Sequence, residues 1–320
     1  MLPREEFAHL PTRIEALPRL TKLLGGPEIL IKRDDQTGLA FGGNKTRKLE
    51  YLLADALTQG AKMVLTTGAA QSNHCRQTAA AAARCGLDCT LVLVGPQPDR
   101  TSSNLFLDHL LGARIVWTEK DLRDLTLQTA FQKAQEEGKN PYLIPYGGSN
   151  ALGAYAYLKA FEELAEQLKN EIPNWIVFAS SSGATQAGLW VGSLLKGLST
   201  NILGISVGEP EFQLKENVHR IAVELNEYQN LDLKLDADQI FVNDSYTGEG
   251  YGFMNDLDRS AIQLFARQEG ILLDPVYTGR AGAGLIDLIR TGFFKKDQRV
   301  LFWHTGGTPA LFADKYMEYL

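Results

Sequence analysis

Short apolar or β-branched runs alternate with longer amphipathic stretches along almost the whole chain. The runs have the composition of buried strands, whereas the stretches repeat apolar residues every three or four positions, as helices do. We expect strands at residues 29–33, 63–67, 90–94, 114–117, 142–144, 175–179, 202–207, 240–242 and 300–303, and helices at residues 49–59, 77–85, 122–137, 152–168, 184–195, 212–226 and 257–269. This alternation predicts an α/β protein whose open, mostly parallel sheets carry helices on both faces.

The composition narrows the classes of function. The chain has 320 residues, of which 44% are hydrophobic and 22% charged, as in ordinary globular proteins. Its net charge of −6 and its lack of basic runs argue against nucleic acid as the main partner. The first residues, MLPREEF, lack the apolar stretch of a signal peptide, and no segment has the length of a membrane span. We therefore expect a cytoplasmic protein with no membrane partner.

The three cysteines give little support for a metal site. Cys85 and Cys89 are separated by three residues, and His74 lies beside Cys75. A second pair of ligands at finger-like spacing is missing, so we expect no metal and thiols in a reducing compartment.

The segments that follow strands are where a parallel sheet binds ligands. The sequence FGGNKTRKLE at residues 41–50 places Lys45 close to Arg47 and Lys48. Neighbouring cations and burial both disfavour the ammonium form, which makes a lysine a better nucleophile toward a carbonyl. An exposed basic helix start is the alternative. The spacing of a phosphate-binding P-loop is absent.

A second segment, TGAAQSNH at residues 67–74, follows the strand at 63–67. Ser72 or Asn73 either caps the next helix or contacts a ligand. A third segment, SSSGATQAG at residues 180–188, brings hydroxyl groups and a glycine to a helix start without charge. Such a helix start favours a single phosphate group, although an ordinary loop remains the alternative. The Gly-x-Gly-x-x-Gly pattern of dinucleotide sites is missing.

The last two segments are DPVYTGR at 274–280 and HTGG at 304–307. Tyr277 is either a core residue or stacks on a planar ligand, and Thr305 is expected to point into the crevice. Ser182 and His304 do not indicate a hydrolase, because Gly-x-Ser-x-Gly is absent. Together the segments provide an amine, a phosphate cradle and an aromatic ring, which are the requirements of pyridoxal 5′-phosphate.

These residues resemble the pyridoxal-phosphate enzymes of the tryptophan-synthase β fold type (fold type II). The sequences GGNKTRKLEYL and QSNHCRQ are typical of the branch that contains 1-aminocyclopropane-1-carboxylate (ACC) deaminase and D-cysteine desulfhydrase. The resemblance extends from IKRDD at residues 31–35 to HTGG at residues 304–307.

The resemblance implies a role for each site residue. It implies that Lys45 binds the cofactor covalently, that Asn73 forms a hydrogen bond with the cofactor's 3′-oxygen, and that Tyr277 stacks on the pyridine ring. The phosphate would be held by the loop of Ser181, Ser182, Gly183, Ala184 and Thr185. The substrate would contact Ser72, Asn73, Gln71, Tyr251 and Thr278, with Ser72 and Tyr277 also serving in catalysis.

Two threonines separate the activities within this branch. ACC deaminases have a glutamate directly after the stacking tyrosine, where this chain has Thr278. They have a leucine in the HxGG turn, where this chain has Thr305. Either Thr278 or the cofactor-binding Thr305 would contact the pyridine nitrogen, and a hydroxyl group there makes a weaker electron sink than a carboxylate would. A weaker sink suffices for β-elimination, in which a thiolate leaves at once. Threonines at these two positions are the pattern seen in D-cysteine desulfhydrases, so the resemblance implies D-cysteine as substrate and pyruvate, ammonia and sulfide as products. L-cysteate sulfo-lyase and ACC deaminase are the alternatives, and a non-catalytic cofactor carrier is the weakest.

The resemblance also implies a division that composition does not reveal. A small domain at residues 48–156 would be inserted into a large cofactor-binding domain made of residues 1–47 and 157–320, with one sheet in each. Enzymes of this type are usually homodimers, so we expect one here.

Overall fold

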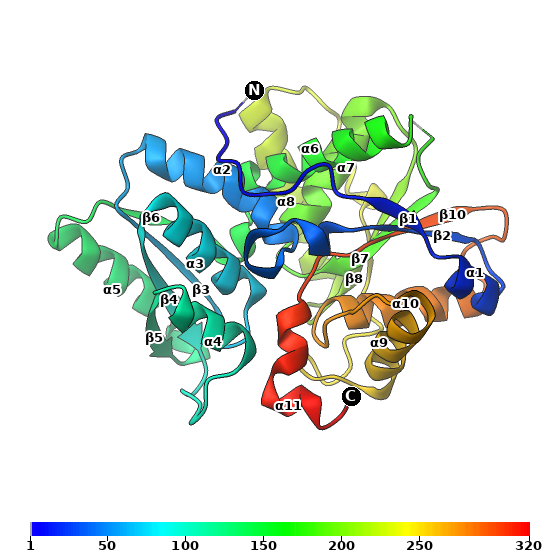
Figure 1. The fold of residues 1–320 in the computed structure, drawn as a ribbon. Helices are drawn as coiled ribbons and strands as arrows, with labels where there is room; N and C mark the ends of the chain where they lie inside the picture. The colour runs from blue at the N-terminus through cyan, green and yellow to red at the C-terminus, as the bar shows by residue number, and fades with distance from the viewer. Residues whose placement is uncertain (1, 170) are drawn as a thin grey trace.

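The computed structural model describes residues 2–169 and 171–320, which form two sheets and the helices around them (Figure 1). The larger sheet has six strands in the order β1 (Ile14–Ala16), β2 (Glu28–Lys32), β10 (Arg299–Trp303), β7 (Trp175–Ser180), β8 (Asn201–Ser206) and β9 (Phe241–Asn243). Only β1 runs antiparallel to its neighbour among these described strands. The smaller sheet is all parallel, in the order β5 (Arg114–Thr118), β4 (Asp88–Val94), β3 (Met63–Ala69) and β6 (Pro141–Leu143). The predicted fold class is confirmed.

Both faces of the six-stranded sheet are buried, because alternate residues of its central strands enter two different cores. Ile176 and Phe178 of β7 pack in one core, and Val177 and Ala179 pack in the other. The first core is covered by α6 (Ala151–Gln167), α7 (Ala184–Lys196) and α8 (Glu211–Gln229). The second is covered by α1 (Pro18–Leu24), α9 (Asp256–Glu269) and α10 (Thr278–Arg290), on the opposite side of the sheet (Figure 1).

The four-stranded sheet is covered in the same way. Helices α2 (Asn44–Thr58) and α3 (Asn73–Cys85) pack on one face, and α5 (Arg123–Glu136) packs on the other. Helix α4 (Ser103–Leu110) lies against α3, and the short α11 (Asp314–Met317) follows the last strand. All four strands come from the range 48–156, but the limits of that range fall inside α2 and α6, which pack together. The division into two domains stays a prediction.

Helix α10 was not expected, because three glycines interrupt its pattern. A Cβ on Gly279 would lie 2.6 Å from the backbone oxygen of Asp274, and one on Gly282 would lie 2.8 Å from Leu273. The glycines thus allow the helix to pack closely against the segment before it, and the packing outweighs their low helix propensity. Strand β1 and helices α1, α4 and α11 were also missed; each is short. No helix of the described residues is long and apolar enough to cross a membrane.

Candidate active site

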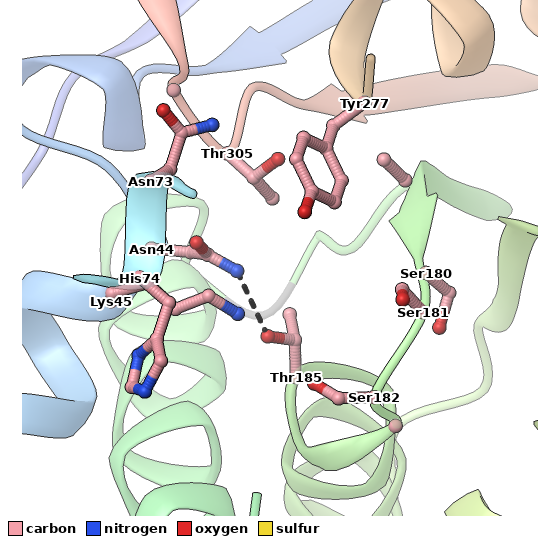
Figure 2. Close-up of a pocket in the computed structure, with 13 residues that line it drawn as sticks. Asn44, Lys45, Asn73, His74, Ser180, Ser181, Ser182, Thr185, Tyr277 and Thr305 are labelled. Atoms are coloured by element: carbon pink, nitrogen blue, oxygen red, sulfur yellow. Dashed lines mark hydrogen bonds between the residues drawn. The ribbon is translucent and has the colours of Figure 1, made fainter. Parts of the chain in front are cut away.

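A cavity of about 480 Å³ lies where the carboxyl ends of β7 and β10 meet the first turns of α2, α3 and α7 (Figure 2). This position beyond parallel strands is the usual ligand site of open α/β sheets. The residues that line it are Asn44, Lys45, Asn73, His74, Ala179, Ser180, Ser181, Ser182, Gly183, Thr185, Tyr277, Thr305 and Gly306.

A strained loop delivers Lys45 to the cavity. Residues 40–43 have φ values of 43°, 69°, 65° and 125°, and only the last two are glycines. The loop is tied to its surroundings by Gly43 N, which donates to Asp34 O at 3.0 Å, and by Asn44 N, which donates to Thr305 O at 2.9 Å. Gly43 is required there, since a Cβ would lie 2.7 Å from Gln77 Nε2. Helix α2 then begins, with Lys45 in its first turn.

Burial lowers the pKa of Lys45 to about 8, against the opposing effect of a hydrogen bond with Lys48. Both amines lie close to one carbonyl oxygen, that of Gly147, at 3.3 Å for Lys45 and 3.2 Å for Lys48. Burial and the charge of Lys45 lower the pKa of Lys48 well below its ordinary value. The expectation that Arg47 would act on Lys45 is wrong. Arg47 lies on another face of α2, where it pairs with Asp34 and Glu163 at 2.9 Å.

Hydroxyl groups and free backbone N–H groups gather at the start of α7. Gly183 precedes the helix with a φ of 92°, and the first turn contains no acidic residue. The first N–H groups of a helix have no acceptor within it and carry the positive end of the helix dipole, so they favour an anion. Ser182 accepts a hydrogen bond from Ser149 at 2.7 Å, and Thr185 accepts one from Asn44 at 3.2 Å. The latter bond connects the start of α7 with the neighbour of Lys45.

The start of α3 provides the opposite wall. Ser72 caps this helix, since its Oγ accepts from Cys75 N at 3.2 Å. Asn73 faces the cavity, and its Oδ1 accepts from Arg76 and Asn104. His74 is buried, and burial lowers its pKa well below the ordinary value. Thr66 Oγ1 gives its hydrogen to Ile144 O at 2.9 Å, so His74 Nε2 donates to Thr66 across 2.8 Å. The imidazole is therefore neutral with its proton on Nε2.

Thr278 and Thr305, the two threonines at the positions that separate activities within the branch, have different surroundings. Thr305 lines the cavity beside Tyr277 (Figure 2). Thr278 is fully buried, and its hydroxyl donates to Asp274 Oδ1 at 2.7 Å while accepting from Asp274 N at 2.7 Å. The same carboxylate accepts from the backbone N–H groups of Val276 and Tyr277 at 3.0 Å. Thr278 thus fixes the turn that presents Tyr277, and it does not line the cavity.

The family model described as "Pyridoxal-phosphate dependent enzyme" matches residues 6–306. D-cysteine desulfhydrase of Salmonella typhimurium is 45% identical over 97% of this chain and 96% of its own, and that of Klebsiella pneumoniae is 43% identical over the same shares. The chain belongs to the pyridoxal-phosphate-dependent enzymes. A crystal structure of an ACC deaminase homologue superposes on 100% of this chain and 97% of its own, with a TM-score of 0.91 and 36% identity.

Pyridoxal phosphate is accordingly the cofactor of this family member, and the cavity fits it. Lys45 offers a readily deprotonated amine for the aldehyde, and the start of α7 suits the phosphate. Asn73 and Thr305 offer polar contacts, and Tyr277 offers an aromatic face. The donor set therefore matches a planar aldehyde with one phosphate group.

The cavity brings together most of the residues expected from the sequence. Eight of them line it: Lys45, Asn73, Ser181, Ser182, Gly183, Thr185, Tyr277 and Thr305. Ala184 and Ser72 are buried in the helix starts behind it. Gln71 and Tyr251 line a second cavity of about 1010 Å³, and Tyr251 Oη lies 2.7 Å from Tyr277 Oη. This hydrogen bond joins the walls of the two cavities.

Five lining residues were not expected as site residues: Asn44, His74, Ala179, Ser180 and Gly306. Asn44 directly precedes Lys45 and His74 directly follows Asn73 in the two branch-specific segments, and this proximity was the available signal. Nothing in the sequence shows that the imidazole of His74 is buried.

Proposed function

We propose that this enzyme catalyses β-elimination from D-cysteine or a similar β-substituted amino acid, with pyruvate, ammonia and sulfide as products. The supporting observation is the Lys45 amine, whose pKa of about 8 suits proton transfer near neutral pH, in a cavity that also holds Thr305 rather than a carboxylate. The relatives named D-cysteine desulfhydrase support the same assignment.

Lys45 has two roles in this proposal. It holds the cofactor in the resting enzyme, and as a free amine it takes the Cα proton of the substrate. The bound cofactor supplies the electron sink that makes this proton acidic. The electron pair left by the C–H bond forms a Cα–Cβ double bond as the C–S bond breaks and the thiolate leaves. Water then hydrolyses the released 2-aminoacrylate to pyruvate and ammonia.

The α-carboxylate of the substrate would bind at the start of α3. The first N–H groups of this helix and the hydroxyl of Ser72 point to an anion, and Gln71 lies at the same turn. Because Ser72 already accepts from Cys75 N, its own hydrogen is free to be donated. Asn73 and the Ser181–Thr185 loop would bind the cofactor, and Ala184 would contribute its backbone N–H.

Tyr277 and Tyr251 would serve the leaving group. Burial raises the pKa of both phenols, so they stay protonated at neutral pH. One phenol donates its hydrogen to the other in the bond between them. The second phenol is then free to donate its own hydrogen to the sulfur of the leaving group. Tyr277 would also stack on the pyridine ring.

Thr305 is the proposed partner of the pyridine nitrogen. Thr278 was an equal candidate, but its only hydroxyl hydrogen is donated to Asp274, its oxygen accepts from Asp274 N, and it does not line the cavity. A hydroxyl partner keeps the sink weak, which supports elimination of a thiolate over opening of a cyclopropane. L-cysteate is the competing substrate, because binding its sulfonate in place of a thiol would require only additional anion-binding groups in the site.

Pyruvate formation from D-cysteine, L-cysteine, β-chloro-D-alanine, L-cysteate and ACC tests the proposal in one assay. We expect D-cysteine and β-chloro-D-alanine to be turned over fastest. ACC or L-cysteate at the rate of D-cysteine would overturn the substrate assignment. Lys45→Ala should lower the rate at least about 100-fold and prevent the cofactor from being fixed to the protein by borohydride reduction, which mass spectrometry measures. Lys62→Ala, on an exposed lysine, is the matched control and should change neither.

We also propose that the enzyme is a cytoplasmic homodimer. Support for the dimer comes from the family resemblance, and sedimentation should give twice the mass of one chain. The free thiols of Cys75, Cys85 and Cys89 are typical of a reducing compartment. A catalytically silent cofactor carrier would keep Lys45 and the phosphate loop but show no turnover of any substrate in the assay above.

A further inference from the structure

Arg76 is a fully buried cation behind the wall of the cavity, one helical turn beyond Asn73. Its Nη1 donates to Asn73 Oδ1 at 3.0 Å and to Asn104 Oδ1 at 2.6 Å, and its Nη2 donates to Gly42 O at 2.9 Å. Within residues 2–169 and 171–320, no carboxylate forms a hydrogen bond or ion pair with this guanidinium. Burial lowers the pKa of Arg76 to about 10, and the charges of Asp108 and Asp274 oppose this effect without contacting the guanidinium. A buried cation whose direct partners are all uncharged is costly, so its hydrogen bonds to these oxygens call for a functional reason.

These contacts decide which way the Asn73 amide points. A guanidinium can only donate, so the Asn73 atom that faces Arg76 must be the oxygen. Asn104 Nδ2 donates to the same oxygen at 2.9 Å. The Asn104 amide is itself oriented, because its oxygen accepts from Arg76 and its nitrogen donates to Gln71 O at 2.9 Å. With Oδ1 of Asn73 held twice from behind, Nδ2 is left for the cavity, and Figure 2 shows it on the side of Thr305 and Tyr277.

The third contact reaches the loop that carries Lys45. Gly42 is one of four consecutive residues with positive φ, two of which are not glycine. Such backbone persists only where its surroundings hold it. Arg76 provides one of the bonds that hold it, since Gly42 O accepts from Nη2. A single side chain thus fixes both the donor of α3 and the loop before the reactive lysine of α2.

We propose that Arg76 is a positioning residue, which holds the Asn73 amide with its NH₂ group toward the cofactor ring and ties Asn73 to the Lys45 loop. The inference rests on the proposed function, in which Asn73 binds the cofactor, and it takes the contact to be donation to the cofactor's 3′-oxygen. Arg76 itself does not line the cavity and acts through Asn73 and Gly42.

The test is a double-mutant cycle of Arg76→Met and Asn73→Ala in the holoenzyme, read from the pH titration of the cofactor's visible absorbance. A donor to the cofactor's 3′-oxygen stabilises the deprotonated form of the bound cofactor, which carries more negative charge on that oxygen. Losing the donor therefore raises the pKa of the bound cofactor. We expect each single variant to move the titration to higher pH by about one unit and to lower kcat/KM roughly 10-fold to 100-fold. In the Asn73→Ala background, Arg76→Met should move the titration no further. Equal and additive shifts, or no shift in Arg76→Met, would overturn the proposal.

Two further variants keep the test decisive. If Arg76→Met folds poorly, Asn104→Ala removes the second donor to Asn73 Oδ1 while the arginine stays, and it should shift the titration in the same direction by less. Thr78→Val is the matched control, since Thr78 is a buried residue of the same helix whose hydroxyl forms no hydrogen bond within the described residues; it should leave the titration unchanged. Failure of the proposed function would be seen separately, as a wild-type holoenzyme that shows the cofactor titration but forms no pyruvate from D-cysteine.

Discussion

Helix α2 carries buried cations on two faces whose surroundings differ in one respect, the presence of carboxylates. On one face Arg47 meets Asp34 in a two-pronged ion pair, with Nε to Oδ2 and Nη2 to Oδ1 both at 2.9 Å. On the other face Lys45 and Lys48 share the carbonyl oxygen of Gly147. Burial lowers the pKa of both kinds of cation, but around Arg47 the carboxylates of Asp34 and Glu163 outweigh burial and raise it.

The comparison shows how one helix provides both stability and reactivity. The paired face also includes Lys32, whose Nζ contacts Glu163 at 2.6 Å, and Tyr157, whose hydroxyl donates to Asp34 Oδ2 at 2.7 Å. Each charge there has a partner, so the helix start is held rigidly. The unpaired face leaves Lys45 partly deprotonated at neutral pH, as a nucleophile and base requires. The ion pairs of Arg47 thus hold the helix start on which the reactive Lys45 lies.

Asp34→Ala should have the largest effect, because it leaves the buried cations Arg47 and Lys32 with a single carboxylate, that of Glu163. Loss of one partner of a buried pair costs about 3–5 kcal/mol of the free energy of unfolding. Urea unfolding of the apoenzyme measures it. The control is Asp124→Ala, which breaks an exposed pair with Arg123 and should cost below about 1 kcal/mol. Equal costs for the two variants would mean that the Asp34 face contributes no more than a surface pair.

The spacing of these residues shows what the sequence could and could not predict. Lys45 and Lys48 are three apart and share a helix face, whereas Arg47, two residues from Lys45, must lie elsewhere. Helical geometry was therefore enough to exclude Arg47 from the lysine site, once the helix was known to begin at Asn44 rather than near Leu49. The sequence predicted too late a start for this helix because its first turn is polar and has no apolar repeat to mark it.

Other features of the site depend on tertiary contacts that leave no trace in the local sequence. Most strands were predictable, because their β-branched runs are buried on both faces. Thr278 was expected beside the substrate, but its hydroxyl binds Asp274, a contact that arises only when residues 274–278 form a turn. Gly282 of α10 likewise looks unfavourable for a helix until its packing against Leu273 is known.

The unpaired face predicts a specific pH dependence for the apoenzyme. Lys45 has a pKa of about 8 in the folded protein, against an ordinary lysine value of 10.5, so between these values the unfolded chain binds more protons. The free energy of unfolding should therefore rise with pH in this window, by up to about 1.4 kcal/mol per unit from this residue. Lys45→Met should remove that contribution, which unfolding titrations of the two proteins would show as a difference in slope. The rate at which the apoenzyme binds the cofactor covalently should level off above pH 8 and fall about tenfold per unit below pH 8, because only the neutral Lys45 amine reacts.

Tyr157→Phe should give the smallest change and separates the two faces most cleanly. The variant loses one hydrogen bond to Asp34 while the ion pair with Arg47 stays, so the free energy of unfolding should fall by about 1–3 kcal/mol. Lys45 faces away from this cluster, so the midpoint of covalent cofactor binding should stay near pH 8. A midpoint that moves together with stability would show that the paired cluster sets the reactivity of Lys45 as well as its position. An unchanged midpoint with lowered stability would show that carboxylates hold the helix and that burial alone tunes the amine.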